Sequence, residues 1–331
     1  MTVGPTTASP GARILGVGAY RPARRVGNDE VSGPIESSDG WIRRHSGIVS
    51  RRFAGDDESV VAMGAAAADK ALAHAGVQAS DVDMVLLASM SYLSQSPAAA
   101  PQVAHAIGGF GAAAMDVGAA CAGFGYALAL ADGLVRSGTC RHVVVVGSER
   151  MSDVVDPGDR STAFLFADGA GAVVVGAARE PGIGPVVWGS DGGRHRMIAH
   201  SSSWRDLRDD DVPWPTLRMR GPEVFRWVLT EISAACRRAL EAAGVAADEL
   251  AAFIPHQANL RLVEGLAKSL GLPPSVVVAR SVITEGNTSA ASIPLGLEAL
   301  LAQGGLPAGG KALLSGFGAG LAHASMVVTL P

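Results

Sequence analysis

The sequence contains 331 residues, of which 48% are hydrophobic and 18% are charged, and this balance excludes an intrinsically disordered chain. Its net charge of −4 gives no broad basic surface, which argues against nucleic acid as a partner. No uninterrupted apolar run reaches the length of a membrane-spanning helix, so we expect no membrane association.

The three cysteines, Cys121, Cys140 and Cys236, lie far apart and form no CxxC pair. This pattern argues against a disulfide framework and against a metal site, and it favours a reducing, cytoplasmic compartment. The N-terminal stretch "MTVGPTTASPGA" (1–12) has no basic patch followed by an apolar core. We therefore interpret it as a flexible lead-in and not as a signal peptide.

Short apolar runs alternate with helical stretches along the chain. Near-continuous runs of valine, leucine and isoleucine predict strands that are covered on both faces, as in layered α/β proteins. The runs are "RILGVGAY" (13–20), "VDMVLLASM" (82–90), "HVVVVGSE" (142–149), "GAVVVGA" (171–177), "LAAFIPH" (250–256), "SVVVAR" (275–280), "KALLSGFG" (311–318) and "ASMVVTL" (324–330).

An internal repeat is the stronger signal. The stretch "KALAHAGVQASDVDMVLLAS" (70–89) aligns with "RALEAAGVAADELAAFIPHQ" (238–257), so that Gly76 meets Gly244. Each copy predicts a helix, a glycine C-cap, an acidic turn and a strand. At the same offset, Cys121 falls opposite "EGNTSAASIPLGLEALLA" (285–302). Chance similarity in a chain rich in alanine and glycine is the alternative, but two modules in the same order favour gene duplication.

The duplication predicts two similar halves, residues 12–180 and 181–331, which divide near "AAREPGIGP" (177–185). The polar stretch from residue 191 to residue 216 contains "SSSWRDLRDDDVPWP" and is expected to be a surface excursion.

Cys121 lies at the predicted turn from a strand into an alanine-rich helix, within "AACAGFG". A helix N-terminus favours the thiolate, and small neighbours would let a substrate approach closely. The alternative is a buried structural thiol, which is the commoner role of cysteine.

Three further segments are candidates for chemistry. His256 follows an apolar strand in "FIPHQANLR", Asn287 lies in "EGNTSAAS", and "LLSGFGAGLAHAS" (313–325) runs from a strand into a glycine-rich turn. Each segment taken alone also has an ordinary structural interpretation. His256 could be a histidine whose hydrogen bonds are satisfied within the fold, Asn287 could cap a helix or serve a turn, and the glycine-rich segment could be a tight turn. Two halves packed about a pseudo-twofold axis would bring them to one cavity with Cys121.

Together, "SSDGWIRRHSGI", "DVGAACAGFGYAL", "DRSTAFLFADGAGAVVV", "PHQANLR", "GNTSAAS" and "GFGAG" occur in an order that resembles the β-ketoacyl-acyl carrier protein synthase III family. The resemblance covers about residues 12–331. It implies the thiolase-like α/β fold, in which two duplicated halves form αβαβα layers. It also implies an acyltransferase that condenses an acyl-CoA starter with malonyl-ACP, releases CoA and CO2, and initiates fatty acid or type II polyketide synthesis.

The same resemblance implies residue roles. Cys121 matches the nucleophile that carries the acyl group, and His256 with Asn287 matches the pair that promotes decarboxylation. The backbone N–H groups of Cys121 and Ala319 would form the oxyanion hole, and Phe317 matches a residue beside the acyl group. The resemblance implies a homodimer and implies no cofactor.

The resemblance also implies residues that contact the substrates. Trp41 and Arg160 would clamp the CoA adenine, with the pantetheine channel lined by Gly221, Phe225 and Asn259. The acyl carrier protein would contact Gln257, Arg261, Arg226 and Lys268. The family commonly has arginine where His45 stands, which puts the phosphate contacts of CoA in question.

Several alternatives stay open. An acyltransferase on the same scaffold would move the acyl group to a hydroxyl or an amine, although the intact cysteine, histidine and asparagine favour condensation. A degradative thiolase would be expected to carry another cysteine in the C-terminal glycine loop, and an inactive partner subunit would be expected to have lost Cys121. The sequence leaves open which acyl-CoA is the starter and which pathway takes the product.

Overall fold

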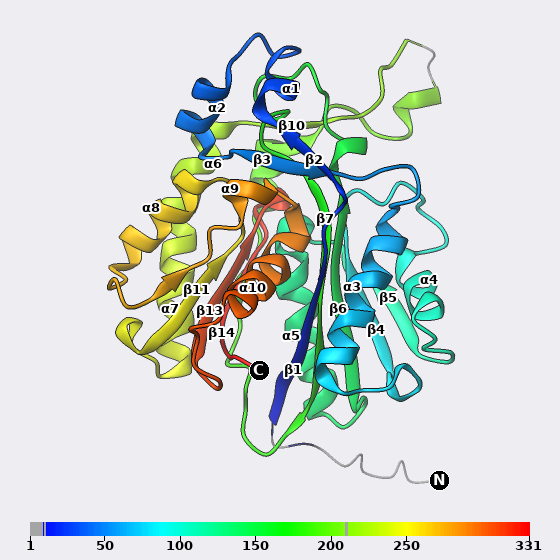
Figure 1. The fold of residues 1–331 in the computed structure, drawn as a ribbon, viewed down its shortest axis with the longest axis vertical. Helices are drawn as coiled ribbons and strands as arrows, with labels where there is room; N and C mark the ends of the chain where they lie inside the picture. Colours follow the sequence, from blue (N-terminus) through cyan, green and yellow to red (C-terminus); the bar gives the residue numbers. More distant parts are fainter. Residues whose placement is uncertain (1–8, 10, 209–210) are drawn as a thin grey trace.

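The computed structural model describes residue 9, residues 11–208 and residues 211–331 (Figure 1). The predicted lead-in at residues 1–12 lies mostly outside the described residues. The first of two five-stranded sheets has the strand order β1-β7-β6-β4-β5. Its strands are β1 (Gly11–Tyr20), β4 (Met84–Ala88), β5 (Ala113–Asp116), β6 (His142–Arg150) and β7 (Asp168–Ala178).

The second sheet repeats the first. Its order, written from the other end, is β8-β14-β13-β11-β12, so each strand has a counterpart in the same place. In both sheets the last three strands run parallel and the others pair antiparallel. The strands are β8 (Val187–Gly189), β11 (Leu250–Pro255), β12 (Val277–Val278), β13 (Lys311–Phe317) and β14 (His323–Thr329). The expected division at residues 180 and 181 falls between β7 and β8.

Helices form the other three layers (Figure 1). α5 (Gly123–Arg136) and α10 (Ser292–Gln303) lie between the sheets and pack on both. α3 (Val60–Ala75) and α4 (Ala99–Ala106) cover the outer face of the first sheet, while α7 (Ser233–Ala243) and α8 (Leu260–Leu270) cover that of the second. The expected αβαβα layering is therefore confirmed.

The repeated glycines act as predicted. Gly76 and Gly244 end α3 and α7 in the left-handed conformation, with φ of 65° and 61°. Glycine also permits close packing between the halves: a Cβ at Gly147 of β6 would lie 2.4 Å from the carbonyl oxygen of Ala290. Small residues thus let the start of α10 approach the first sheet.

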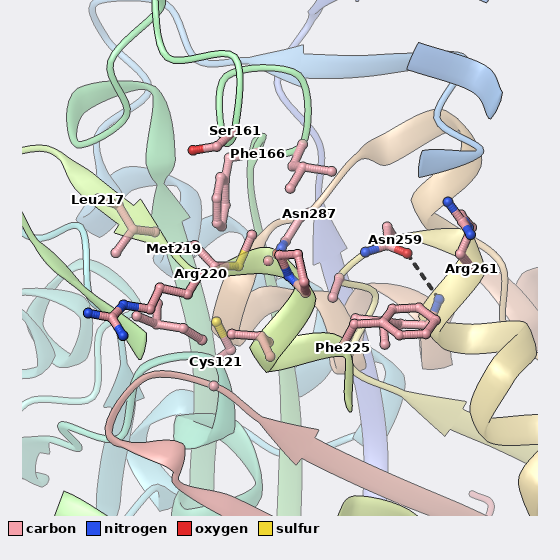
Figure 2. A pocket seen from close by; sticks show the side chains of 18 of the residues that line it. Cys121, Ser161, Phe166, Leu217, Met219, Arg220, Phe225, Asn259, Arg261 and Asn287 are labelled. Carbon is pink, nitrogen blue, oxygen red and sulfur yellow. Dashed lines mark hydrogen bonds between the residues drawn. The ribbon is translucent and has the colours of Figure 1, made fainter. Parts of the chain in front are cut away.

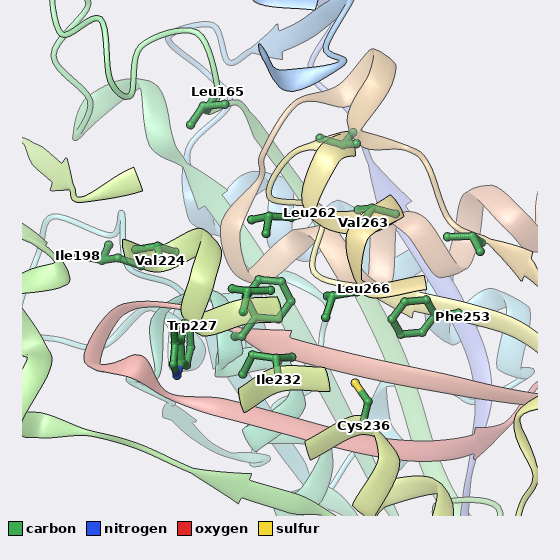
Figure 3. Packing of buried hydrophobic residues seen from close by; sticks show 14 of the residues in the cluster. Leu165, Ile198, Val224, Trp227, Ile232, Cys236, Phe253, Leu262, Val263 and Leu266 are labelled. Carbon is green, nitrogen blue, oxygen red and sulfur yellow. The ribbon is translucent and has the colours of Figure 1, made fainter. Parts of the chain in front are cut away.

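The second half packs a large apolar cluster between its sheet and its outer helices. Figure 3 shows Trp227, Ile232 and Cys236 from the helical run facing Phe253 of β11 and Leu266 of α8. That run joins α6 (Gly221–Trp227) to α7 through a π-helical turn at Val228–Ile232. Cys236 is fully buried here, so it serves as a packed thiol.

Shorter elements cap one end of the layers (Figure 1). They are β2 (Arg24–Gly27), α1 (Asn28–Ser32), α2 (Asp39–Ser46), β3 (Ser50–Phe53), β9 (Ile198–His200), β10 (Leu217–Met219) and α9 (Val282–Glu285). In the described part of the polar stretch 191–216, most side chains are exposed, but Met197 and Ile198 are buried. The expectation of a surface excursion is thus wrong for these two. Ile198 pairs with Met219 of β10, and the carbonyl of Met197 just before β9 accepts from the N–H of Arg220, so both side chains join the apolar cluster of the second half.

None of the described helices combines the length and the apolar character needed to cross a membrane.

Candidate active site

A cavity of about 730 Å³ opens between the capping elements and the ends of the two sheets (Figure 2). Its wall contains Cys121 from the first half, and His256, Asn287 and Phe317 from the second. Cys121 and His256 each follow a strand, and Asn287 precedes α10. The structure therefore brings together the residues that the repeat placed at one cavity.

Cys121 lies in a 3₁₀ turn (Ala120–Ala122) that leads into α5, and its side chain is 7% exposed. Gly318 packs directly against it, since a Cβ at residue 318 would lie 2.7 Å from the Cβ of Cys121. Burial raises the pKa of Cys121 to about 12, and a hydrogen bond from Ser289 opposes this shift. Burial, and not the helix start, therefore sets the protonation state of the resting thiol.

Asn287 is held by the backbone on both sides. Its N–H donates to the carbonyl of Leu165, and its carbonyl accepts from the N–H of Ala167. Its side-chain Oδ1 accepts from the N–H of Ser289 at 2.9 Å. The Oδ1 atom is thereby fixed, which leaves the amide N–H2 as the group that Asn287 can offer to a ligand.

His256 is 3% exposed, and its backbone N–H donates to the carbonyl of Ser315. Nδ1 of the ring lies 2.7 Å from Oγ of Ser292, and the ring of Phe317 packs against the imidazole in a T-shaped arrangement with centroids 5.2 Å apart. Burial lowers the pKa of His256 to about 3, so the ring is neutral at physiological pH.

The loop after Phe317 passes beside the thiol. The N–H of Gly318 donates to the carbonyl of Ala322 at 2.9 Å and is therefore already used. Ala319, the residue predicted for the oxyanion hole, begins the next 3₁₀ turn (Ala319–Leu321).

A buried carboxylate lies behind the thiol. Glu149 is fully buried at the end of β6, where burial raises its pKa. It accepts hydrogen bonds from the backbone of Met90, from the hydroxyl of Ser91 at 2.5 Å and from the N–H of Ala290 at 3.3 Å. Glu149 thereby ties a cavity-wall loop of the first half to the segment that carries Ser289.

At the mouth of the cavity, the predicted clamp residues are in contact. The guanidinium of Arg160 lies 4.8 Å from the ring centroid of Trp41. His45 stacks on the same indole with a centroid distance of 4.1 Å, and its Nδ1 lies 2.8 Å from the carbonyl oxygen of Trp41. His45 therefore adds a second flat ring to this cluster.

The residues predicted for the pantetheine channel, Gly221, Phe225 and Asn259, all line the cavity. Asn259 caps α8, because its Oδ1 accepts from the N–H of Leu262 at 3.0 Å (Figure 2). Only its Nδ2 is left for a ligand.

The residues predicted to meet the carrier protein divide into two groups. Arg226 and Arg261 are exposed at the cavity mouth, and Lys268 is exposed two turns along α8 from Arg261. Gln257 is fully buried, and its side chain bonds the carbonyl of Pro255 and the N–H of Val282. The assignment of Gln257 to a surface contact is therefore wrong, because its amide is enclosed and satisfied within the fold.

Much of the cavity wall comes from residues that the sequence motifs did not point to. Leu217 and Ile198 from the β9–β10 pair, and Met90, line the cavity together with Phe166 and Val224. Figure 2 shows Leu217 on the opposite side of Cys121 from Asn259. The alternation of Leu217 and Met219 is a strand signal that could have been found, whereas Ile198 is hidden in a polar stretch.

Comparison with known families supports the resemblance that the sequence motifs indicated. A sequence model of 3-oxoacyl-[acyl-carrier-protein] synthase III matches residues 115–192, and the model of its C-terminal part matches residues 240–330. The β-ketoacyl-[acyl-carrier-protein] synthase III of Streptomyces glaucescens is 51% identical over 99% of this chain and 98% of its own. The mycobacterial synthase III of Mycobacterium avium is 50% identical over 100% of this chain and 98% of its own.

Comparison with solved structures indicates the same family. The priming β-ketosynthase of the R1128 polyketide pathway superposes with a TM-score of 0.97 at 47% identity, covering 100% of this chain and 98% of its own. The 3-oxoacyl-(acyl carrier protein) synthase III of Pseudomonas aeruginosa superposes with a TM-score of 0.90 at 38% identity, covering 97% and 98%. The chain therefore has the thiolase-like fold and belongs to the β-ketoacyl-acyl carrier protein synthase III family, the initiating condensing enzymes of fatty acid or polyketide synthesis.

Proposed function

We propose that Cys121 carries the starter acyl group, and that His256 and Asn287 activate malonyl-ACP in the same cavity. The observation that carries this proposal is that all three side chains line one cavity although they come from both halves of the chain. In the first step, the sulfur of Cys121 attacks the acyl-CoA thioester. The thiol proton leaves with the CoA sulfur, and the acyl group stays on Cys121.

In the second step, the bond between the malonyl carboxylate and the methylene carbon breaks and releases CO2. The electron pair forms an enolate on the remaining thioester, and donors aimed at its oxygen lower the barrier. The neutral ring of His256 and the free N–H2 of Asn287 are suited to this role, since both can donate without carrying a net charge.

In the third step, the enolate carbon attacks the acyl-Cys121 carbonyl, and the sulfur leaves and takes up a proton. The N–H groups of Cys121 and Ala319 would hold the oxyanion, which is consistent with the N–H of Gly318 being already bonded. The product is 3-oxoacyl-ACP. Each step uses a group of this chain, so the proposed reaction needs no cofactor.

The charge around the mouth supports CoA and an acyl carrier protein as partners. Arg160, Arg220, Arg226 and Arg261 line the cavity, and no acidic side chain is among its described lining residues. Such a rim attracts the phosphates of CoA and an acidic protein partner. The Trp41–Arg160 pair offers flat groups on which an adenine would stack.

We further propose a cytoplasmic homodimer. Within the described chain, β5 pairs with β4 alone, which leaves its other edge open at the margin of the sheet. Met115 on this strand is 40% exposed and the nearby Phe110 is 76% exposed, so a second copy could pair there. All three cysteines are free, in keeping with a reducing compartment. Light scattering would measure the mass in solution, and a monomer would overturn the dimer.

Variants that separate the steps test the proposed function. Asn287→Ala should still accept an acyl group on Cys121 but should lose CO2 release from malonyl-ACP by 100-fold or more. Cys121→Ala should lose acyl loading. The acyltransferase alternative predicts instead that Asn287→Ala leaves turnover with a hydroxyl or amine acceptor intact while the wild type releases no CO2.

A further inference from the structure

Ser292 connects two buried groups behind the catalytic histidine. Its Oγ lies 2.7 Å from Nδ1 of His256 and 3.2 Å from the backbone nitrogen of Gln257. Ser292 is 1% exposed, His256 3% and Gln257 0%. Solvent therefore cannot complete the hydrogen bonds of this cluster, and its three groups have to satisfy one another.

The number of hydrogens on the three groups determines which group donates in each hydrogen bond of Ser292. The N–H of Gln257 can only donate, so Oγ of Ser292 accepts from it. If Nδ1 of His256 also carried a hydrogen, Oγ would accept twice, and the hydroxyl hydrogen would be left without a partner in a buried site. If Nδ1 is bare, the hydroxyl donates to it and every group is satisfied. The second arrangement is favoured, because an unpaired buried donor is costly.

We propose that Ser292 is a positioning residue that fixes the tautomer of His256, so that the ring hydrogen resides on Nε2 toward the cavity. This inference rests on the proposed function for its use: an enolate oxygen needs a donor, and a ring with its hydrogen on Nδ1 would present a lone pair instead.

Two other features of the site agree with this assignment. The ring is neutral at physiological pH, because burial lowers the pKa of His256 to about 3, so it carries one hydrogen to be placed. The ring of Phe317 packs against the imidazole at an interplanar angle of 74° and hinders the rotation that would exchange the two nitrogens. Ser292 is the first residue of α10, so the middle layer of the fold sets the orientation of a side chain from the second sheet.

Nitrogen-15 NMR of ring-labelled histidine in the wild-type enzyme tests the assignment directly, with His256→Gln to identify the signal. We expect a protonated Nε2 and a bare Nδ1 that accepts a hydrogen bond. A hydrogen on Nδ1 would overturn the proposal. This readout needs neither substrate nor a Ser292 variant, so it stands even if the proposed condensation fails.

Partial reactions test the consequence. Ser292→Ala should slow decarboxylation of malonyl-ACP by 10-fold or more, while acyl loading of Cys121 stays within twofold. The matched control is Ser325→Ala, which removes an equally buried hydroxyl that bonds Ser315 instead of the histidine. It should change neither rate more than twofold. Unchanged decarboxylation in Ser292→Ala, or an equal loss of both rates, would contradict the positioning role. A wild type that cannot decarboxylate malonyl-ACP would instead remove the proposed function.

Discussion

The hydroxyl of Ser289 donates a hydrogen bond to Sγ of Cys121 across 3.3 Å, and this contact joins the two halves of the chain at the proposed nucleophile. Ser289 belongs to the turn that precedes α10, and Cys121 belongs to the equivalent turn before α5. The symmetry of the fold thus places the start of one central helix against the start of the other. The second half thereby supplies a hydrogen-bond donor to the thiol of the first.

Ser289→Ala should raise the pKa of Cys121 further, because the removed hydrogen bond favours the thiolate. Alkylation of Cys121 by iodoacetamide at pH 8 should therefore slow by about three- to tenfold, since this hydrogen bond stabilises the thiolate by roughly 1 kcal/mol more than the neutral thiol. The rate is measured on the Cys121 peptide by mass spectrometry. Ser161→Ala, a change at an exposed residue of the cavity wall, is the control. Equal rates in Ser289→Ala and the wild type would show that the contact has no effect on the thiol.

The burial of His256 predicts an acid-sensitive fold. Its pKa is about 3 when folded and 6.5 ordinarily, so below pH 6.5 the unfolded chain binds a proton that the folded chain does not. The contribution of His256 to the free energy of unfolding is therefore at its maximum above pH 6.5. It falls by about 1.4 kcal/mol per pH unit between pH 6.5 and about pH 3. Between pH 7 and pH 5, the free energy of unfolding should drop by roughly 2 kcal/mol more in the wild type than in His256→Gln. Urea titrations at both values measure this difference, and identical drops would contradict it.

Leu217 should limit the length of the starter acyl group that Cys121 accepts. It is 2% exposed and lines the cavity across Cys121 from Asn259, where an acyl group on the sulfur would extend (Figure 2). Leu217→Phe should lower loading of a six-carbon acyl-CoA relative to acetyl-CoA by about tenfold, since a bulkier wall shortens the space. Competition between the two thioesters, followed by mass spectrometry, gives the ratio. Val277→Phe, at an exposed position of β12, should leave the ratio unchanged. An unaltered ratio in Leu217→Phe would place the acyl group elsewhere.

Lys268 should act on the carrier protein and not on CoA, because it is exposed on α8 but does not line the cavity. Lys268→Glu should raise the KM for malonyl-ACP by about three- to tenfold at low salt, with a smaller effect at high salt. The KM for acyl-CoA should not change. Arg141→Glu, a reversal at another exposed position just before β6, is the control. Equal effects of the two reversals would indicate a general charge effect.

The repeat and the motifs predicted the layers of the fold, and local sequence rules explain why. A helix that ends in a left-handed glycine and turns into an apolar strand is specified within 20 residues, as at Gly76 and Gly244. The same rules located Cys121, His256 and Asn287, since each lies next to a recognisable strand or helix end.

The supporting groups could not be predicted in this way. Glu149 bonds the N–H of Ala290 across a sequence separation of 141 residues, and no local pattern encodes that contact. Gln257 follows His256 in a polar motif, but the direction of its side chain depends on Val282, which belongs to another element. Ile198 lies in a polar stretch and is buried because of its pairing partner in β10.

In the proposed reaction, Cys121 transfers its acyl group to the carbon of a decarboxylated malonyl unit. A single-turnover experiment tests it most directly: the enzyme is loaded with a labelled acyl-CoA, freed of CoA, and then mixed with malonyl-ACP. We predict that the label leaves the Cys121 peptide, that CO2 is released in equal amount, and that the label appears in 3-oxoacyl-ACP. A label that stays on Cys121, or that moves to an oxygen or nitrogen acceptor without release of CO2, would show that Cys121 does not transfer its acyl group to a malonyl carbon.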